Sequence, residues 1–283
     1  MQEVMAAVNR LQVATEAFAA LGARLSIGST DDVAPELVAA LDDVLEAAGV
    51  PGIDTVEPAQ RMMLLGVVRT MFAQASDVLE RPTREAGWSY TDPVLLEGIG
   101  RASMMMPALM AAAPELADVS SLLDIGTGVG LLAIAATKTW TKCSVVGIDL
   151  WEPSLELARH NVHAADCDDR IELRKQDVVD LDDIERFDCV WFPTFFFTRE
   201  TIARALPKIR TANSAGGYAV LAHYEAPPEP LAQATTRLRT IRDGGSELDR
   251  DSAAELLRDA GYGDVHALAR TTPIPIGFVI GRK

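Results

Sequence analysis

One stretch near the middle of the chain combines a glycine turn with two carboxylates. Gly126, Gly128 and Gly130 follow a short apolar run that contains Asp124, and a second apolar run ends at Asp149. Glycines placed directly after a strand let the backbone approach a ligand without a clash from a Cβ atom. An acid at the end of the next strand suits the two hydroxyl groups of a ribose. The stretch therefore predicts a nucleoside-binding site.

The spacing of these residues argues against a dinucleotide as the ligand. Dinucleotide-binding enzymes use G-x-G-x-x-G, whose third glycine packs the helix on the strand, whereas this chain has Leu131 at that place and its third glycine at position 130. Asp124 lies two residues before the first glycine, where its charge would repel a pyrophosphate and attract an ammonium group. The predicted ligand has a ribose, a cationic amino-acid end and no phosphates. An NAD(P)-dependent oxidoreductase is the disfavoured alternative.

His223 is the candidate for proton transfer. It stands at the carboxyl end of the run "GGYAVLAH", where a substrate approaches a sheet of this kind. The other three histidines lie on a predicted helix or in the last hairpin, away from the expected site. An imidazole changes charge near neutral pH, so we expect His223 to act as a base or to contact the substrate. The alternative is a strand-end histidine that only makes a local hydrogen bond.

An aromatic cluster follows the predicted fourth strand of the sheet. It is either buried core or one wall of an apolar substrate pocket. Three consecutive methionines, residues 104–106, precede the first strand and could close such a pocket. The aromatic cluster consists of Trp191, Phe192, Phe195, Phe196 and Phe197.

Strands and helices alternate after Ser120. This order predicts a parallel sheet wound by helical crossovers. The last segment, from Asp249, predicts a helix and then two strands, whose hairpin would place an antiparallel strand in the sheet. The predicted strands are "SLLDIG", "CSVVGID", "RIELRKQD", "FDCVWF" and "GGYAVLAH", and the predicted helices between them cover 129–139, 152–165 and 198–211.

The N-terminal third of the chain predicts helices only. Apolar residues recur at helical spacing, and prolines stand near the predicted helix starts. We expect an all-helical region over residues 1–90, which covers the site and pairs two subunits, and a ligand-binding domain over 91–283. The apolar face that we expect a second subunit to bury includes Val8, Leu11, Phe18 and Leu21. The predicted helices span 1–26, 34–48, 57–80 and about 93–113, the last with a kink at Pro107.

Composition limits the partners and the compartment. The chain has 26 basic and 41 acidic side chains in 283 residues, a formal charge of −15. Such a surface repels nucleic acid and anionic membranes, so we expect neither as a partner. The three cysteines are far apart in the sequence, which is typical of reduced thiols, and the N-terminus lacks the pattern of a signal peptide. We therefore expect a cytoplasmic protein without a metal site.

The run "LLDIGTGVG" resembles the first motif, D/E-x-G-x-G-x-G, of the class I S-adenosylmethionine-dependent methyltransferases. The resemblance continues through "VVGIDLWEPSLELARHNV", "DRIELRKQDVVDL" and "LLRDAGYGDV", and it covers about residues 118–283. It implies a seven-stranded Rossmann-like sheet whose last strand is antiparallel, and S-adenosyl-L-methionine as the cofactor. It also implies a role for each matched position: Asp124 at the ammonium group, Gly126 and Gly128 along the methionine part with Gly130 completing the motif, Asp149 at the ribose hydroxyls, Leu150 on the adenine, and Asp177 and the Val178 N–H at the adenine edge. We expect Arg101, on the helix before the first strand, and Tyr90, which precedes that helix, to hold the cofactor carboxylate.

The expected reaction is methyl transfer to a small, partly apolar or aromatic molecule, most simply at oxygen. The run "WFPTFFF" departs from the "[N/D]-P-P-[Y/F/W]" motif of enzymes that methylate the amino groups of DNA or glutamine, and the His-Asp pair of plant-type O-methyltransferases is absent from it. The alternatives are carbon methylation of a quinone-like or keto-acid substrate and a non-catalytic protein that only binds the cofactor.

Overall fold

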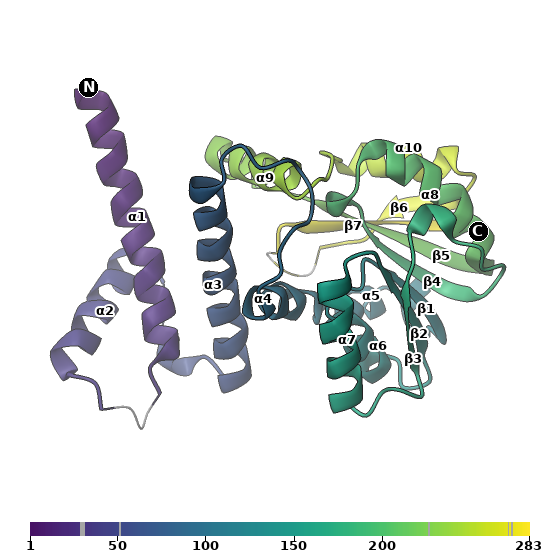
Figure 1. Cartoon of the computed structure of the whole chain (residues 1–283), viewed down its shortest axis with the longest axis horizontal. Coiled ribbons are helices and arrows are strands. Elements are labelled where there is room, and N and C mark those ends of the chain that lie inside the picture. Colours follow the sequence, from purple (N-terminus) through teal and green to yellow (C-terminus); the bar gives the residue numbers. More distant parts are fainter. Residues whose placement is uncertain (29–31, 51, 226, 271, 273) are drawn as a thin grey trace. The chain divides into compact units, whose positions relative to one another are not determined.

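The computed structural model describes residues 1–28, 32–50, 52–225, 227–270, 272 and 274–283. The described chain forms two compact units, Met1–Pro82 and Thr83–Lys283. The first unit is helical, and the second contains a sheet with helices on both faces (Figure 1).

The boundary between the two units falls before residue 90, where the sequence predicts the end of the helical region. The backbone N–H of Gly87 donates to the carbonyl of Arg242 at 2.9 Å. The hydroxyl of Tyr90 donates to the carboxylate of Asp243 at 3.4 Å. Because these bonds attach the segment after Pro82 to the second unit, that segment is part of the unit that contains the sheet.

The first unit is built from α1 (Gln2–Ser26), α2 (Pro35–Ala47), the short η1 (Ile53–Thr55) and α3 (Pro58–Glu80). Pro35 and Pro58 stand in the first turns of their helices, where a missing N–H costs no hydrogen bond. Arg24 is buried and donates to Asp42 at 2.7 Å and to Asp54 at 2.5 Å. The core of this unit consists of Leu25, Leu45, Ile53, Leu65 and Val68.

The apolar face predicted for the first helix divides into two parts. Phe18 and Leu21 pack against the core of the first unit. Val4, Val8 and Leu11 are exposed, although their spacing also places them on one side of α1. The C-terminal half of α1 therefore belongs to the helical bundle, while the apolar residues of its N-terminal half lie at the surface.

The second unit contains a seven-stranded sheet with the order β3-β2-β1-β4-β5-β7-β6. Strands β1 to β5 pair parallel with one another, and β7 pairs antiparallel with both β5 and β6. The predicted seven-stranded sheet with its last strand antiparallel is confirmed. The strands are β1 (Ser121–Ile125), β2 (Ser144–Asp149), β3 (Ile171–Lys175), β4 (Phe187–Pro193), β5 (Asn213–Tyr224), β6 (Gly263–Ala267) and β7 (Ile276–Arg282).

Helices cover both faces of this sheet. Residues of α8 and α10 share one core with alternate residues of the strands, and residues of α5, α6 and α7 share the other. The strand order reverses between β1 and β4, which is the place where open α/β sheets bind ligands. The helices are α4 (Pro93–Ser103), α5 (Met106–Ala111), α6 (Leu131–Thr139), α7 (Glu152–Ala164), α8 (Arg199–Ala212), α9 (Pro230–Arg242) and α10 (Arg250–Asp259), with short η2 (Pro114–Leu116), η3 (Val178–Asp180) and η4 (Thr194–Phe196).

The single helix predicted over residues 93–113 is wrong, because the chain breaks there into α4 and α5. The break lies at Met104 and Met105, before the expected kink. The ring of Pro107 would clash with the carbonyl of the residue four positions earlier, Ser103, in a continuous helix. Pro107 instead stands in the first turn of α5, where its ring is tolerated.

Two helical stretches, Gln60–Glu80 and Pro93–Ala111, are apolar and long enough to cross a membrane by length and composition. Core helices of soluble proteins also meet this criterion, so it is weak evidence. The second stretch is interrupted between α4 and α5, and its Met106 and Met110 are buried in the core on one face of the sheet.

Candidate active site

The glycine turn lies directly between the ends of β1 and β2. The backbone N–H groups of Gly126 and Thr127 both donate to the carbonyl of Ile148, at 2.9 and 3.0 Å. Gly126 and Gly128 have φ angles of +68° and +56°, in the left-handed region that favours glycine. A Cβ on Gly128 would meet no atom closer than 3.9 Å, so the protein leaves open space on that side of the turn.

Gly130 has a different role in the same turn. Its φ of +76° begins α6, and a Cβ there would lie 3.3 Å from the Cβ of Ala158 on α7. This glycine therefore allows α7 to pack closely against the start of α6. Its predicted contact with the cofactor stays a prediction.

Asp124 is buried beneath the turn, with 1% of its surface exposed. Its carboxylate accepts a hydrogen bond from the hydroxyl of Thr127 at 2.7 Å. Burial raises the pKa of Asp124 to about 7, and the nearby charge of Asp149 acts in the same direction, while the bond from Thr127 opposes both. A cationic group placed beside this carboxylate would remove much of the cost of its charge.

Asp149, at the end of β2, connects the turn to the next crossover. One oxygen of its carboxylate accepts from the backbone N–H of Gly128, and the other accepts from that of Trp151, both at 2.8 Å. Burial raises the pKa of Asp149, although these backbone donors lower it. The acid and the glycine turn, predicted from residues 21 positions apart, are thus in direct contact.

The residues predicted to hold an adenine lie at the adjacent ends of β2 and β3. The N–H of Gln176 donates to the carbonyl of Asp149 at 3.0 Å, which brings these two strand ends together. Leu150 is apolar and 57% exposed. The side chain of Asp177 accepts from the N–H of Val179 at 3.1 Å, and the side chain of Val178 is buried in the core, so only the backbone of Val178 is available to a ligand.

Arg101 lies on α4, which packs against the glycine turn. A Cβ on Gly100 would overlap the side chain of Val129. The guanidinium of Arg101 is 3.7 Å from the carboxylate of Glu97, one helical turn earlier, and its side chain is largely exposed. This ion pair is weak at such a distance, so it leaves Arg101 able to turn toward an anionic group. Its predicted role at the cofactor carboxylate stays a prediction.

Three residues that support the turn are not apparent in the sequence pattern. The hydroxyl of Thr127 lies over Gly147 on β2, where a Cβ would be 2.6 Å from it. The side-chain amide of Asn161 donates to the carbonyl of Val129 at 3.0 Å. These contacts of the turn with β2 and α7 are apparent only in the structure. In the sequence, Gly147 within the second strand signals a close approach of another segment.

His223 is at the carboxyl end of β5, as predicted, but its ring is enclosed. The residue is 1% exposed, and its ring lies over Gly277 of β7, where a Cβ would be 2.7 Å from the ring. Nδ1 is 3.3 Å from the carbonyl of Tyr224, and Nε2 has no hydrogen-bond partner within the described chain. Burial lowers the pKa of His223, which favours the neutral form. Its role as a base stays a prediction that requires the packing on Gly277 to open.

The predicted aromatic cluster contributes to both the core and the site. Trp191 and Phe192 are buried on opposite faces of β4. Phe197 packs edge-to-face on Phe192, and its ring is 3.8 Å from the position of a Cβ on Gly126. Phe195 and Phe196 belong to a second aromatic group, which contains Trp88, Tyr90 and Tyr224.

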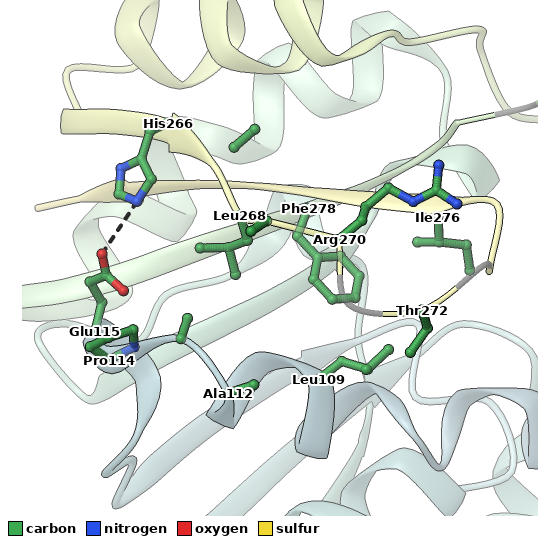
Figure 2. Close-up of a pocket in the computed structure, with 13 residues that line it drawn as sticks. Leu109, Ala112, Pro114, Glu115, His266, Leu268, Arg270, Thr272, Ile276 and Phe278 are labelled. Carbon is green, nitrogen blue, oxygen red and sulfur yellow. Dashed lines mark ion pairs between the residues drawn. The ribbon is translucent and has the colours of Figure 1, made fainter.

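A separate pocket of about 260 Å³ lies between α5 and the β6–β7 hairpin. Figure 2 shows His266 facing Glu115 at one end, at 3.4 Å, and Leu109 and Phe278 among its apolar walls. None of the residues that line it was predicted to bind or react. Within the described ranges, no three His, Cys, Asp or Glu side chains are grouped to hold a metal ion.

Comparison with known proteins agrees with this geometry. Residues 122–217 match the family model described as a methyltransferase domain. A tRNA1(Val) (adenine(37)-N6)-methyltransferase from Vibrio vulnificus is 30% identical over 93 residues, which are 32% of this chain and 39% of that protein. The chain thus covers well under half of the length of this curated relative.

Two solved structures resemble almost the whole chain. An O-methyltransferase family protein from Burkholderia thailandensis has a TM-score of 0.70 at 16% identity, covering 100% of this chain and 97% of that one. Human N-acetylserotonin methyltransferase, solved with S-adenosylmethionine, has a TM-score of 0.68 at 14% identity, covering 99% and 97%. At these identities the likeness establishes the fold, including the helices that precede the sheet.

Proposed function

We propose that the chain is a class I S-adenosylmethionine-dependent methyltransferase and that it methylates an oxygen atom of a small, partly aromatic molecule. The cofactor supplies a methyl group on a sulfonium, which is its own leaving group. The residues of the chain bind the cofactor, align the acceptor and exclude water.

The observation that carries this proposal is the contact between Asp149 and Gly128 at 2.8 Å. This bond holds a carboxylate suited to ribose hydroxyls beside the open side of the glycine turn, where the protein places no side chain. The buried carboxylate of Asp124 suits an ammonium group, and the exposed side chain of Leu150 suits the face of an adenine. These groups fit S-adenosylmethionine, and Asp124 is badly placed for a phosphate.

The choice of a small acceptor is supported by the aromatic residues at the end of β4 and by the acidic composition. Aromatic side chains favour a planar, apolar acceptor, because rings stack and exclude water. A charge of −15 disfavours RNA, the substrate that the name of the Vibrio vulnificus relative implies. The Burkholderia thailandensis protein, whose fold matches over the whole chain, is described as an O-methyltransferase family protein.

Two measurements test the proposal. Calorimetric titration should show binding of S-adenosylmethionine and S-adenosylhomocysteine, with NADH as the matched control that should not bind. Transfer of a radiolabelled methyl group should then be detected on a panel of substituted phenols, and mass spectrometry should place it on oxygen. Binding of NADH alone, or methylation only at carbon, would contradict the proposal.

A further inference from the structure

A buried carboxylate ends α9 within a group of tyrosines and arginines. Asp243 is 4% exposed, and the only hydrogen bond its side chain receives in the described chain is the 3.4 Å bond from the hydroxyl of Tyr90. A buried carboxylate normally has several close donors, so this one retains acceptor capacity. The titratable and charged groups that face it are Arg84, Tyr90, Tyr224, Arg239 and Arg242.

The backbone around Asp243 is fixed by two glycines. A Cβ on Gly245 would overlap the carbonyl of Phe195, and a Cβ on Gly244 would lie 2.9 Å from the Cα of Gly87. The chain at 243–245 therefore packs backbone against backbone on both the end of β4 and the segment after Pro82. Such packing holds the carboxylate in one position, as a site that must align a reacting group requires.

Aromatic rings surround the carboxylate. Phe195 stacks on Tyr224 with ring centroids 4.4 Å apart. Trp88 packs edge-to-face on Tyr90 at 5.1 Å and on Phe196 at 5.2 Å. The rings of Trp88, Phe196 and Tyr224 are only partly buried. Partly exposed rings of this kind offer faces on which a planar aromatic molecule stacks.

Tyr90 also connects this group to the cofactor side of the sheet. The indole N–H of Trp151 donates to the carbonyl of Tyr90 at 2.6 Å. The backbone N–H of the same tryptophan donates to Asp149. Trp151 thus contacts both Asp149, the predicted ribose acid, and Tyr90, which contacts Asp243. The predicted cofactor site and the group around Asp243 are therefore adjacent.

We propose that Asp243 accepts the proton of a phenolic acceptor, and that Tyr90 and Tyr224 form the polar end of the acceptor pocket. The inference rests on the proposed function. The proton of the acceptor hydroxyl passes to the carboxylate, the acceptor oxygen bonds to the methyl carbon, and the bond from that carbon to sulfur breaks with its electron pair left on sulfur. The protein then releases the proton to water.

Asp243 is favoured over His223 by the geometry of β5. Consecutive strand residues point to opposite faces of the sheet, so the ring of His223 lies on the face opposite to that of Tyr224. Tyr224 is in the aromatic group, whereas His223 packs on Gly277. Burial raises the pKa of Asp243 to about 6, while the nearby arginines and Tyr90 lower it, so the carboxylate is a stronger base than an exposed one.

The test uses the full chain loaded with S-adenosylhomocysteine and 4-nitrophenol as the acceptor probe, whose absorbance reports its ionisation. Asp243→Asn should bind S-adenosylhomocysteine within twofold of the wild type and lose at least tenfold in affinity for 4-nitrophenol. Methyl transfer to the phenol best used by the wild type should fall by about 10²–10⁴. The matched control is Glu229→Gln, an exposed acid at the other end of α9, which should change neither quantity.

Tyr90→Phe keeps the test valid if Asp243→Asn fails to fold. It removes the hydrogen bond that lowers the pKa of Asp243, so the acidic limb of 4-nitrophenol binding should move to higher pH. The proposal would be overturned if this acidic limb did not move in Tyr90→Phe, or if Asp243→Asn bound 4-nitrophenol with unchanged affinity. It would also be overturned if His223→Gln, and not Asp243→Asn, lost the acidic limb. Wild type that binds S-adenosylhomocysteine but no phenol also overturns it and leaves the proposed cofactor intact. Failure to bind S-adenosylhomocysteine would defeat the proposed function itself.

Discussion

Asp124 has surroundings that favour its neutral form in the cofactor-free protein. Below about pH 4 both the folded and the unfolded chain carry its proton. As pH rises toward 7, the unfolded chain loses this proton while the folded chain keeps it, because burial raises the folded pKa to about 7. The free energy of unfolding therefore falls across this window by an amount on the order of 4 kcal/mol and is constant above it.

Asp124→Asn, whose side chain is neutral at every pH, should remove this fall in the free energy of unfolding. We expect its melting temperature to exceed that of the wild type by a margin that grows between about pH 4 and pH 7. Thermal unfolding of both proteins without cofactor, followed by circular dichroism across this range, measures the margin. A difference that is independent of pH would show that Asp124 does not titrate in this way.

Cofactor binding should depend on Asp124 in the opposite sense. An ammonium group is held by the charged carboxylate, so the affinity of the wild type for S-adenosylmethionine should fall as pH decreases from 8 to 6, through the raised pKa of Asp124. Asp124→Asn should bind more weakly at pH 8 and lose this dependence. Titration calorimetry at several pH values measures how the affinity of each protein depends on pH. The same pH dependence in both proteins would show that Asp124 does not hold the ammonium group.

Asp149→Ala should weaken binding of S-adenosylmethionine by about 1.5–3 kcal/mol, the cost of losing hydrogen bonds to a charged group. The variant also removes the acceptor for the N–H groups of Gly128 and Trp151, so the turn should become less ordered. Asp180→Ala, at an exposed acid near the same edge, is the control. Equal affinity of both variants would exclude Asp149 from the ribose site.

The sequence predicts those site residues that lie within one local pattern. Asp124, the glycines and Asp149 are recognisable because strand, turn and helix succeed one another along the chain. Thr127 over Gly147, Asn161 at Val129 and Asp243 beside Tyr90 depend on contacts between distant segments. A single sequence does not identify the partners in such pairs: Gly147 within a strand signals a close approach, but nothing in its segment indicates that Thr127 makes it.

At the scale of elements, the glycine turn makes the sharpest prediction. Gly128→Val should reduce cofactor affinity beyond detection, because the branched side chain would fill the open side of the turn. Its φ of +56° also adds strain, which should cost about 1–2 kcal/mol of stability. Gly128→Ala shares the strain but fills less space, so it should retain more affinity. Normal binding by a folded Gly128→Val protein would make the turn purely structural.

The elements that the sequence predicts well are those with a strong apolar period. The five parallel strands, the last hairpin and α1 to α3 agree with prediction. Helix α9 is not predicted, because its sequence is polar and follows several prolines. The proposed acceptor site lies at the end of this helix, at Asp243. The sequence therefore does not predict that site either.

At the scale of the whole molecule, the predicted pairing of two subunits concerns the exposed apolar residues of α1. Val4, Val8 and Leu11 recur at helical spacing on one side of the helix. An exposed apolar stripe of this kind marks an interaction surface. A second copy of the same chain is the occupant we propose, because a stripe on a helix can pair with its own copy around a twofold axis.

Light scattering should then give the mass of a dimer at micromolar concentration. Val8→Glu combined with Leu11→Glu should give a monomer, because four added charges at a twofold interface would be buried without partners. The matched control is Ala6→Glu with Arg10→Gln, which changes the charge by the same amount on the other side of α1. The core of the first unit lies in the other half of α1, so the helical content should stay unchanged. A monomeric wild type, or a control that dissociates equally, would show that this stripe does not hold two copies together.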